Sequence, residues 1–205
     1  MTRLTALAAM LLVSLMAGAT GAPIPKDANR PRLYFPVQKG ASRVYLISEG
    51  NRFNEVVDDV VTAIEDSRAG AKVVTVEIGD PFERLTWSDP QGTLTWEVSD
   101  RGLFWVKKNS TPLLTQRICV LKLPHKPGQS WIVEVFGHKR TMTAHGPEKV
   151  KVPAGEFDAI RVEQRDELAP DQNLTHWYAP GVGLVKEVRG KKSLVVLNSF
   201  TPSKD

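Results

Sequence analysis

Short runs in which apolar and polar residues alternate recur along most of the chain. In residues 94–98, for example, Leu94, Trp96 and Val98 alternate with polar side chains. Successive side chains of a β-strand point to opposite faces, so this pattern predicts a strand with one buried face. Similar runs, rich in β-branched and aromatic residues, are separated by Gly, Pro or Asp at intervals of about 8 to 12 residues. They lie at residues 44–47, 72–78, 103–106, 118–123, 131–136, 140–144, 150–152, 157–165, 176–178, 184–188 and 194–197.

Residues 54–66 are the one segment in which helix competes with strand. Val57, Val60, Val61 and Ile64 recur there at helical spacing. Valine and isoleucine are nevertheless stiff in helices and favoured on a pleated surface. The segment also runs through a short polar break directly into the next strand, as a hairpin would. We therefore expect a strand.

Taken together, the pattern predicts an all-β protein. About ten to twelve strands are too many for one flat sheet, which favours curvature or closure. We expect a single curved antiparallel sheet that forms a half-barrel or open barrel. Residues 33–200 would form this one domain, and residues 201–205 a tail.

The N-terminus has the layout of a secretory signal peptide. Arg3 precedes an almost wholly apolar run at residues 4–17, and small residues follow it. The alternative is a membrane anchor, but the run is shorter than the roughly 20 residues that span a bilayer. We expect a signal peptide over residues 1–19, cleaved between residues 19 and 22, and a flexible Pro-rich leader over residues 20–32.

Export is the predicted fate of the mature chain, to the periplasm or the extracellular space. No cysteine follows the apolar run, so the chain is not expected to be a lipoprotein or to keep a membrane span. Cys119 is the only cysteine, which excludes an intramolecular disulfide. About 185 residues would remain, enough to bury a sizeable core in one domain.

The charge balance gives little support for nucleic-acid binding. Loss of Arg3 with the signal peptide takes Lys+Arg from 27 to 26, against 23 Asp+Glu, which leaves a net charge of +3. The basic residues are scattered and do not form a run of five or more. We therefore expect no nucleic-acid partner.

Three turn motifs stand in a fixed order in the second half of the chain. They are Leu-x-Leu-Pro-x-x-Pro-Gly-x-x-Trp at residues 121–131, Val-Pro-Ala-Gly-x-Phe-x-Ala-x-Arg-Val at 152–162 and Trp-Tyr-Ala-Pro-Gly-Val-Gly-Leu-Val-Lys at 177–186. In this order and spacing the chain, over roughly residues 33–200, resembles the largely uncharacterised TapB-like family of exported bacterial proteins. The resemblance implies a curved sheet similar to envelope half-barrels that cradle lipid, and it implies no catalytic residue.

The glycines and prolines of these motifs are better explained by the backbone conformation of turns than by a binding or catalytic role. Glycine supplies positive φ at turns and proline restricts the backbone. An anion-binding loop would need consecutive glycines that open a helix, whereas strands follow these turns. We expect structural turns at Pro153, Gly155, Pro180, Gly181 and Gly183.

No residue pattern for catalysis, a metal or a cofactor is present. The four histidines, His125, His138, His145 and His176, lack the spacing of a metal site. No serine occupies a nucleophile elbow, and Cys119 lies in an apolar strand that makes it a core residue. We expect a protein that is not an enzyme; a hydrolase that uses His176 or Glu134 is the less favoured alternative.

The tryptophans are the strongest candidates for a binding surface. Aromatic side chains contribute large buried area to a core, but they can also line a groove for an apolar molecule. The predicted ligand-binding wall is formed by Trp96, Trp105, Trp131 and Trp177. The favoured partner is an apolar small molecule or lipid; the alternative is an envelope protein that pairs with an edge strand of an assembly module.

Overall fold

The computed structural model describes residues 32–49, 52–67, 70–79, 92–107, 117–135, 137–190 and 193–203. The predicted signal peptide and the leader up to residue 31 lie outside the described residues. Within these ranges nearly all regular structure is β. Among the described residues the one helical element is the short 3-10 turn η2 (Pro170–Gln172).

Twelve strands follow one another along the chain. The first six are β1 (Ser42–Glu49), β2 (Arg52–Asp66), β3 (Lys72–Ile78), β4 (Thr93–Ser99), β5 (Gly102–Lys107) and β6 (Ile118–Lys122). The second six are β7 (Ser130–Val135), β8 (His138–Val152), β9 (Gly155–Asp166), β10 (Leu174–Ala179), β11 (Gly183–Arg189) and β12 (Ser193–Thr201).

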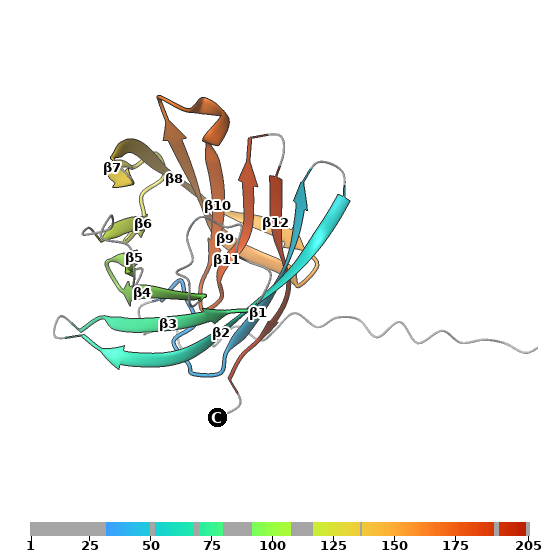
Figure 1. Ribbon diagram of the computed structural model, residues 1–205. Helices are drawn as coiled ribbons and strands as arrows, with labels where there is room; N and C mark the ends of the chain where they lie inside the picture. The colour runs from blue at the N-terminus through green and yellow to red at the C-terminus, as the bar shows by residue number, and fades with distance from the viewer. Residues whose placement is uncertain are drawn as a thin grey trace, which may run out of the picture.

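All twelve strands belong to one antiparallel sheet. Its order is β6-β5-β4-β3-β2-β1-β12-β11-β10-β9-β8-β7. Strands that are consecutive in the chain therefore pair with each other, except for β6 and β7. β1 and β12 pair and join the two halves. β6 and β7 are consecutive in the chain but form the two outer edges of the sheet. Because the sheet curls, these edges approach each other (Figure 1), and the barrel is nearly closed with one seam between β6 and β7.

Register shifts in most of the strand pairs accompany this curvature. One lies between Val44 and Tyr45 where β1 meets β12, and another between Trp177 and Tyr178 where β10 meets β11. Such bulges bend a strand and increase its twist, as closing a sheet on itself requires. The predicted all-β fold with one curved antiparallel sheet is confirmed. Residues 54–66 form part of β2, so the predicted strand is confirmed there too.

The structure differs from the sequence pattern at β8. Residues 140–144 and 150–152 were predicted as separate strands, whereas His138–Val152 is one strand. Gly146 and Pro147 interrupt the apolar pattern without ending the strand, because β8 stays paired with β9 on both sides of a register shift between His145 and Glu148. The long β8–β9 hairpin then reaches β12, where the Ala154 N–H donates to the Leu197 carbonyl at 3.1 Å.

Two clusters of buried side chains form the core. The larger one fills much of the barrel interior and includes Phe35, which precedes β1 and is 3% exposed. The smaller one joins the end of β8 and the start of β9 to β12, with Val152, Phe157 and Leu197 among its members. The segment before β1 is held in place by the barrel, since the Gly181 N–H donates to the Leu33 carbonyl at 2.7 Å.

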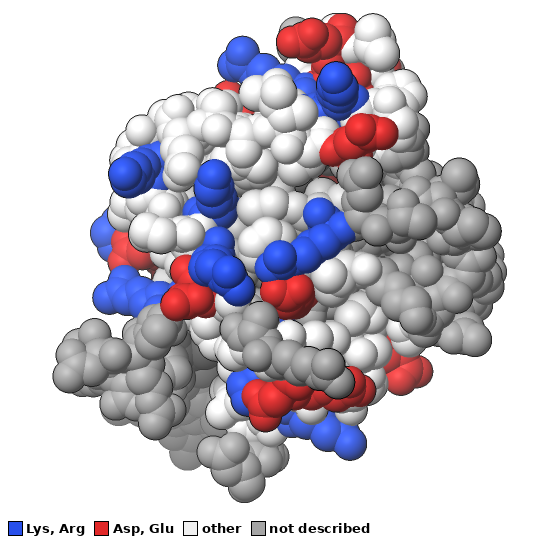
Figure 2. Space-filling model, turned by 90° about the vertical axis from the view of Figure 1, so that its left-hand side faces the viewer, with Lys and Arg blue, Asp and Glu red and all other residues white. Residues whose placement is uncertain are grey.

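Charges of both signs are mixed on the outside. Figure 2 shows Lys and Arg side chains interspersed with Asp and Glu over the face at the left of Figure 1. Arg117 illustrates the arrangement: it pairs with Glu97 and stacks over the Phe104 ring, with the guanidinium carbon 3.6 Å from the ring centroid. In the part of the chain that the structure describes, no helix is long and apolar enough to cross a membrane.

Candidate functional site: the barrel interior

A cavity of about 190 Å³ lies inside the curled sheet. Among the described residues, side chains from the segment before β1 and from every strand except β2 line it. Strand alternation accounts for the lining, because on β10 Leu174, His176 and Tyr178 face the cavity and the residues between them do not. Most lining side chains are apolar: Phe35, Ile78, Leu94, Trp96, Leu103, Trp105, Ile118, Val120, Val135, Met142, Leu174, Leu184 and Val195.

Trp96 and Trp105, two of the four tryptophans predicted to form a binding wall, line this cavity. They are direct partners across the β4–β5 pair. The Phe35 ring packs against Trp96, with ring centroids 5.4 Å apart, a favourable spacing for two aromatic rings. The segment before β1 therefore meets the tryptophan-rich part of the wall.

Trp131, the third predicted wall residue, is not among the residues that line the cavity. It lies on edge strand β7, and its indole Nε1 donates a 2.9 Å hydrogen bond to the Cys119 carbonyl on β6. β6 and β7 are not hydrogen-bonded neighbours in the sheet. A side chain thus bridges the seam, and Trp131 ties the two edges of the barrel together.

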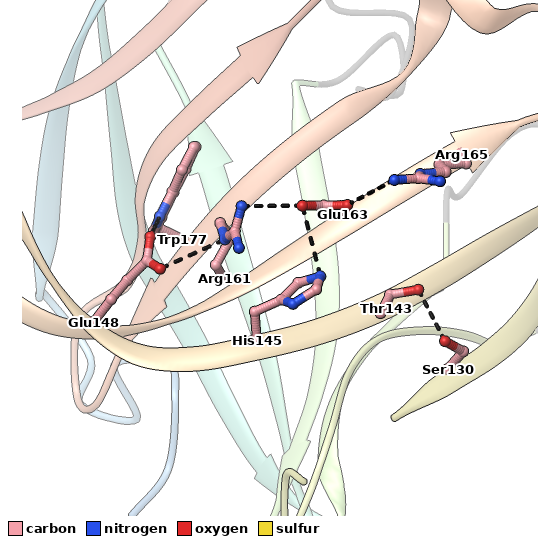
Figure 3. A network of polar contacts seen from close by, with 8 residues as sticks. All are labelled: Ser130, Thr143, His145, Glu148, Arg161, Glu163, Arg165 and Trp177. Atoms are coloured by element: carbon pink, nitrogen blue, oxygen red, sulfur yellow. Dashed lines mark hydrogen bonds and ion pairs between the residues drawn. The ribbon is translucent and has the colours of Figure 1, made fainter. Parts of the chain in front are cut away.

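Trp177, the fourth predicted wall residue, points to the opposite face of β10 from the cavity. Its neighbours His176 and Tyr178 face inward, so the two-residue period of the strand turns Trp177 outward. The indole Nε1 donates a 2.6 Å hydrogen bond to Glu148 Oε1 (Figure 3). Lys186 Nζ lies 4.9 Å from the ring centroid, in cation–π geometry.

Trp177 belongs to a polar network on the outer face of β8, β9 and β10 (Figure 3). Arg161 lies at its centre, with Nε 3.5 Å from Glu148 Oε2 and Nη1 donating to Glu163 Oε1 at 3.0 Å. His145 and Arg165 also contact Glu163. Partly exposed ion pairs such as these, which remain screened by water, contribute on the order of 1 kcal/mol each. We assign the network to the stability of the outer sheet surface.

A buried ion pair that the sequence analysis did not identify lies in the cavity wall. Arg43 on β1 is 4% exposed and binds Asp59 on β2 through two hydrogen bonds, Nε–Oδ1 at 2.8 Å and Nη2–Oδ2 at 2.7 Å. Its Nη1 donates to the Val182 carbonyl at 3.2 Å. Burial alone would lower the pKa of Arg43, but Asp59 offsets this effect and leaves the pKa above its ordinary value. The guanidinium stays charged and fixed.

A second polar pair is formed by His176 on β10 and Glu187 on β11. They are cross-strand partners, and His176 Nε2 lies 3.2 Å from Glu187 Oε2. Burial opposes ionisation of Glu187, but contacts with His176 and Arg189 outweigh it and lower the pKa of the carboxyl. Glu134, the other residue of the hydrolase alternative, is exposed on β7 and is not part of the cavity lining.

Three buried polar atoms of the cavity wall have no hydrogen-bond partner among the described protein atoms. They are Trp96 Nε1, Gln164 Nε2 and His176 Nδ1. Buried polar groups in folded proteins are nearly always paired. Sequence reasoning singled out Trp96 but not Gln164, because a glutamine in an alternating strand carries no signal that separates an inward amide from a solvated one.

The two tyrosines of the wall are neutral hydroxyl groups. Burial raises the pKa of both Tyr45 and Tyr178. The Tyr45 hydroxyl donates to the Leu184 carbonyl at 3.0 Å. Neither ring therefore adds charge to the cavity.

The five predicted turn residues lie at the ends of two hairpins. Gly155, Gly181 and Gly183 all adopt positive φ, at +133°, +72° and +92°. The Gly181 N–H is already bonded to the Leu33 carbonyl, so this backbone donor is not available to an anion. Gly183 lies close to Arg43, and an added Cβ there would be 2.5 Å from Arg43 Nη1. The turn residues Pro153, Gly155, Pro180, Gly181 and Gly183 thus shape the backbone, and the last of them also makes room for the buried arginine.

Neither a reactive thiol nor a metal cluster is found in the described part of the chain. Burial raises the pKa of Cys119 to about 11, so the thiol is protonated at neutral pH. No group of three or more His, Cys, Asp or Glu side chains among the described residues is arranged to hold a metal ion.

Two solved structures share this fold. A candidate exported protein with a YmcC-like fold from Bacteroides fragilis superimposes with a TM-score of 0.53 at 16% identity, over 83% of this chain and 99% of that one. A candidate lipoprotein from Parabacteroides distasonis gives a TM-score of 0.50 at 15% identity, over 84% and 100% of the two chains. No family model matches the chain, and neither does any curated protein. The resemblance to the TapB-like family therefore stays a prediction, and what the comparisons show is a fold shared with these two proteins.

Proposed function

We propose that this protein binds a small apolar or amphipathic molecule in the barrel interior and does not catalyse a reaction. The observation that carries the proposal is the largely apolar, partly open cavity of about 190 Å³ inside the curled sheet. Protein interiors are normally packed with few voids. The wall of this cavity is mostly apolar. A ligand that covers it would remove apolar surface from water, which is favourable by about 25 cal/mol per Å².

The volume limits the size of the ligand. A dry apolar cavity of about 150 Å³ is enough to hold benzene, whereas pockets for drug-sized ligands start at about 300 Å³. The cavity lies between the two at about 190 Å³. It accommodates a ring or a short acyl segment, so a whole phospholipid would be held by only part of one chain.

The composition of the wall supports binding over catalysis. His176 and Glu187 form a histidine–carboxylate pair, which in hydrolases activates a hydroxyl or thiol nucleophile. None of the cavity-lining residues that the structure describes is Ser, Thr or Cys. The pair therefore has no such nucleophile beside it in the wall.

We propose the bacterial envelope as the site of action. The N-terminal sequence pattern supports export, as does the resemblance to the TapB-like family. The two structures named above are of a candidate exported protein and a candidate lipoprotein. In this setting the cavity would carry or sense a molecule that is poorly soluble in water.

Uptake of toluene, followed by isothermal titration calorimetry, tests the binding function. Leu184→Phe places a larger side chain in the cavity wall, and Ile132→Phe adds the same ring to the outer face of β7, where Ile132 is 70% exposed. We expect saturable binding of toluene by the wild type, and affinity at least about tenfold weaker for Leu184→Phe, because overpacking removes the space. Ile132→Phe should bind like the wild type. No binding, or equal loss in both variants, would contradict the proposal.

The seam supports a second candidate function, an assembly module. β6 and β7 are edge strands that have no backbone partner on one side in the sheet, and unpaired edges can accept a strand from another protein. Cross-linking from residue 132 in the envelope would identify such a partner. If no reproducible partner is recovered, this second function is abandoned.

A further inference from the structure

Gln164 is a buried amide that faces the cavity from the middle of an apolar surface. It is 6% exposed, and its Nε2 has no hydrogen-bond partner among the described protein atoms. Its direct partners on the neighbouring strands are Met142 on β8 and Leu174 on β10, which also line the cavity. Neither side chain can accept a strong hydrogen bond from an amide. The two N–H bonds of Gln164 are therefore available to a molecule in the cavity.

His176 supplies the complementary group. Its Nε2 lies 3.2 Å from Glu187 Oε2, and an ionised carboxylate only accepts hydrogen bonds, so Nε2 carries the proton of this contact. When Nε2 carries the only ring proton, the other ring nitrogen is an acceptor. That nitrogen, Nδ1, is buried and has no partner among the described atoms.

The sheet register places this donor and this acceptor close together. Gln164 pairs with Leu174, and His176 is two residues further along β10 on the same face. Diagonal neighbours of this kind are about 7 to 8 Å apart across an antiparallel pair, within reach of long side chains. One oxygen atom between them can accept a hydrogen bond from Gln164 Nε2 and donate its own proton to His176 Nδ1. A hydroxyl group has both functions.

The charges around the cavity disfavour an ionised ligand. Arg43 is held by two hydrogen bonds to Asp59, so it is not free to pair with an anion. Glu187 contacts His176 and, at 3.8 Å, Arg189. A carboxylate at Gln164 would therefore have no counter-charge of its own, and an isolated charge in an apolar site is strongly unfavourable.

From this arrangement we infer that the cavity selects an uncharged amphiphile, in which a hydroxyl group is bound between Gln164 and His176 and an aliphatic or ring portion fills the apolar remainder. The inference rests on the proposed binding function and specifies its ligand class.

Four probes of similar size separate the contribution of the hydroxyl group to binding affinity from that of the apolar part. They are n-hexanol, n-hexane, n-pentyl methyl ether and hexanoate. The ether has as many heavy atoms as the alcohol, but it accepts hydrogen bonds without donating. We expect n-hexanol to bind at least about tenfold more tightly than n-hexane or the ether, the effect of one or two hydrogen bonds at a buried site. Hexanoate should bind most weakly.

Two matched variants test whether Gln164 is responsible for the preference for n-hexanol over n-hexane. Gln164→Met keeps the length of the side chain and removes the donor. Gln129→Met makes the same change at a half-buried glutamine that does not line the cavity. In Gln164→Met the preference for n-hexanol over n-hexane should fall to less than about threefold with n-hexane binding retained, because only the polar contact is lost. Gln129→Met should keep the full preference.

Nitrogen NMR of the His176 ring gives a readout that needs no substitution. Addition of n-hexanol should shift the Nδ1 resonance as it gains a hydrogen bond, while n-hexane should leave it in place. If n-hexane and n-hexanol bind the wild type equally, or if hexanoate binds best, the inference is overturned and the apolar binding function stands. If none of the probes binds, the proposed function itself fails. A Gln164→Met protein that keeps the full preference for the alcohol would also overturn the inference.

Discussion

Replacement of Gly183 by alanine should destabilise the folded protein through two separable effects. The first is backbone strain, since Gly183 has φ +92° and an L-residue in this region costs about 1 to 2 kcal/mol. The second is contact, since the new Cβ would lie 2.5 Å from Arg43 Nη1 and 3.3 Å from Phe35 Cδ2. Arg43 cannot move without losing its hydrogen bond to the Val182 carbonyl, and a hydrogen bond to a charged group contributes about 1.5 to 3 kcal/mol.

Gly181→Ala is the matched control. Gly181 also has positive φ, at +72°, but a Cβ there would meet no atom within 4 Å. Gly181→Ala should therefore lower the free energy of unfolding only through backbone strain, by about 1 to 2 kcal/mol. Gly183→Ala should cost about 2.5 to 5 kcal/mol in free energy of unfolding, from the sum of both effects.

Urea unfolding followed by tryptophan fluorescence measures both values. The difference in free energy of unfolding between Gly181→Ala and Gly183→Ala should also shrink in an Arg43→Met/Asp59→Leu background. In this background the obstructing guanidinium and its carboxylate partner are replaced together. Equal destabilisation by Gly181→Ala and Gly183→Ala would refute the argument that Gly183 makes room for Arg43. An unchanged difference in the double-variant background would refute it as well.

Three further predictions concern other parts of the molecule. The lowered pKa of Glu187 implies stabilisation that is present above the unfolded pKa of about 4.3 and lost as pH falls through the lower folded pKa. The stability difference between the wild type and Glu187→Gln, measured by urea unfolding at a series of pH values, should therefore shrink as pH falls through this acid range; a difference that stays constant through the same range would contradict the assignment. Trp177→Phe removes the hydrogen bond to Glu148 and should lower the free energy of unfolding by about 0.5 to 1.5 kcal/mol without changing toluene affinity in calorimetry; weaker toluene binding would place Trp177 in the site after all. With the pKa of Cys119 at about 11, about one thiol in a thousand is ionised at pH 8, so iodoacetamide should react slowly until urea unfolds the chain, and fast labelling of the folded protein would show an exposed thiolate.

Local patterns predicted the strands well because each depends on a few neighbouring residues. Valines and an isoleucine at residues 54–66 favoured β2 in spite of their helical spacing, and the structure agrees. The same two-residue period also indicates which side of a strand each residue faces. Applied to β10 it separates Trp177 from His176 and Tyr178, but the period alone does not reveal which side is the interior.

The polar part of the cavity could not be predicted because it depends on pairing between strands. Arg43 and Asp59 are partners across β1 and β2, and this register is visible only in the folded sheet. The His176–Glu187 pair depends on a bulge. Counting outward from the partners Tyr178 and Leu184 at the turn would place Lys186 opposite His176, and the register shift between Trp177 and Tyr178 moves Glu187 there instead.

Xenon binding tests the central claim, an apolar binding cavity inside the barrel, most directly. Xenon enters dry apolar cavities of about 150 Å³, and the cavity of about 190 Å³ is bounded by side chains that include Trp105, Met142 and Leu184. A crystal structure determined under xenon pressure should show an ordered xenon atom among these three residues. A barrel interior that takes up no xenon, with side chains filling the space, would contradict the account.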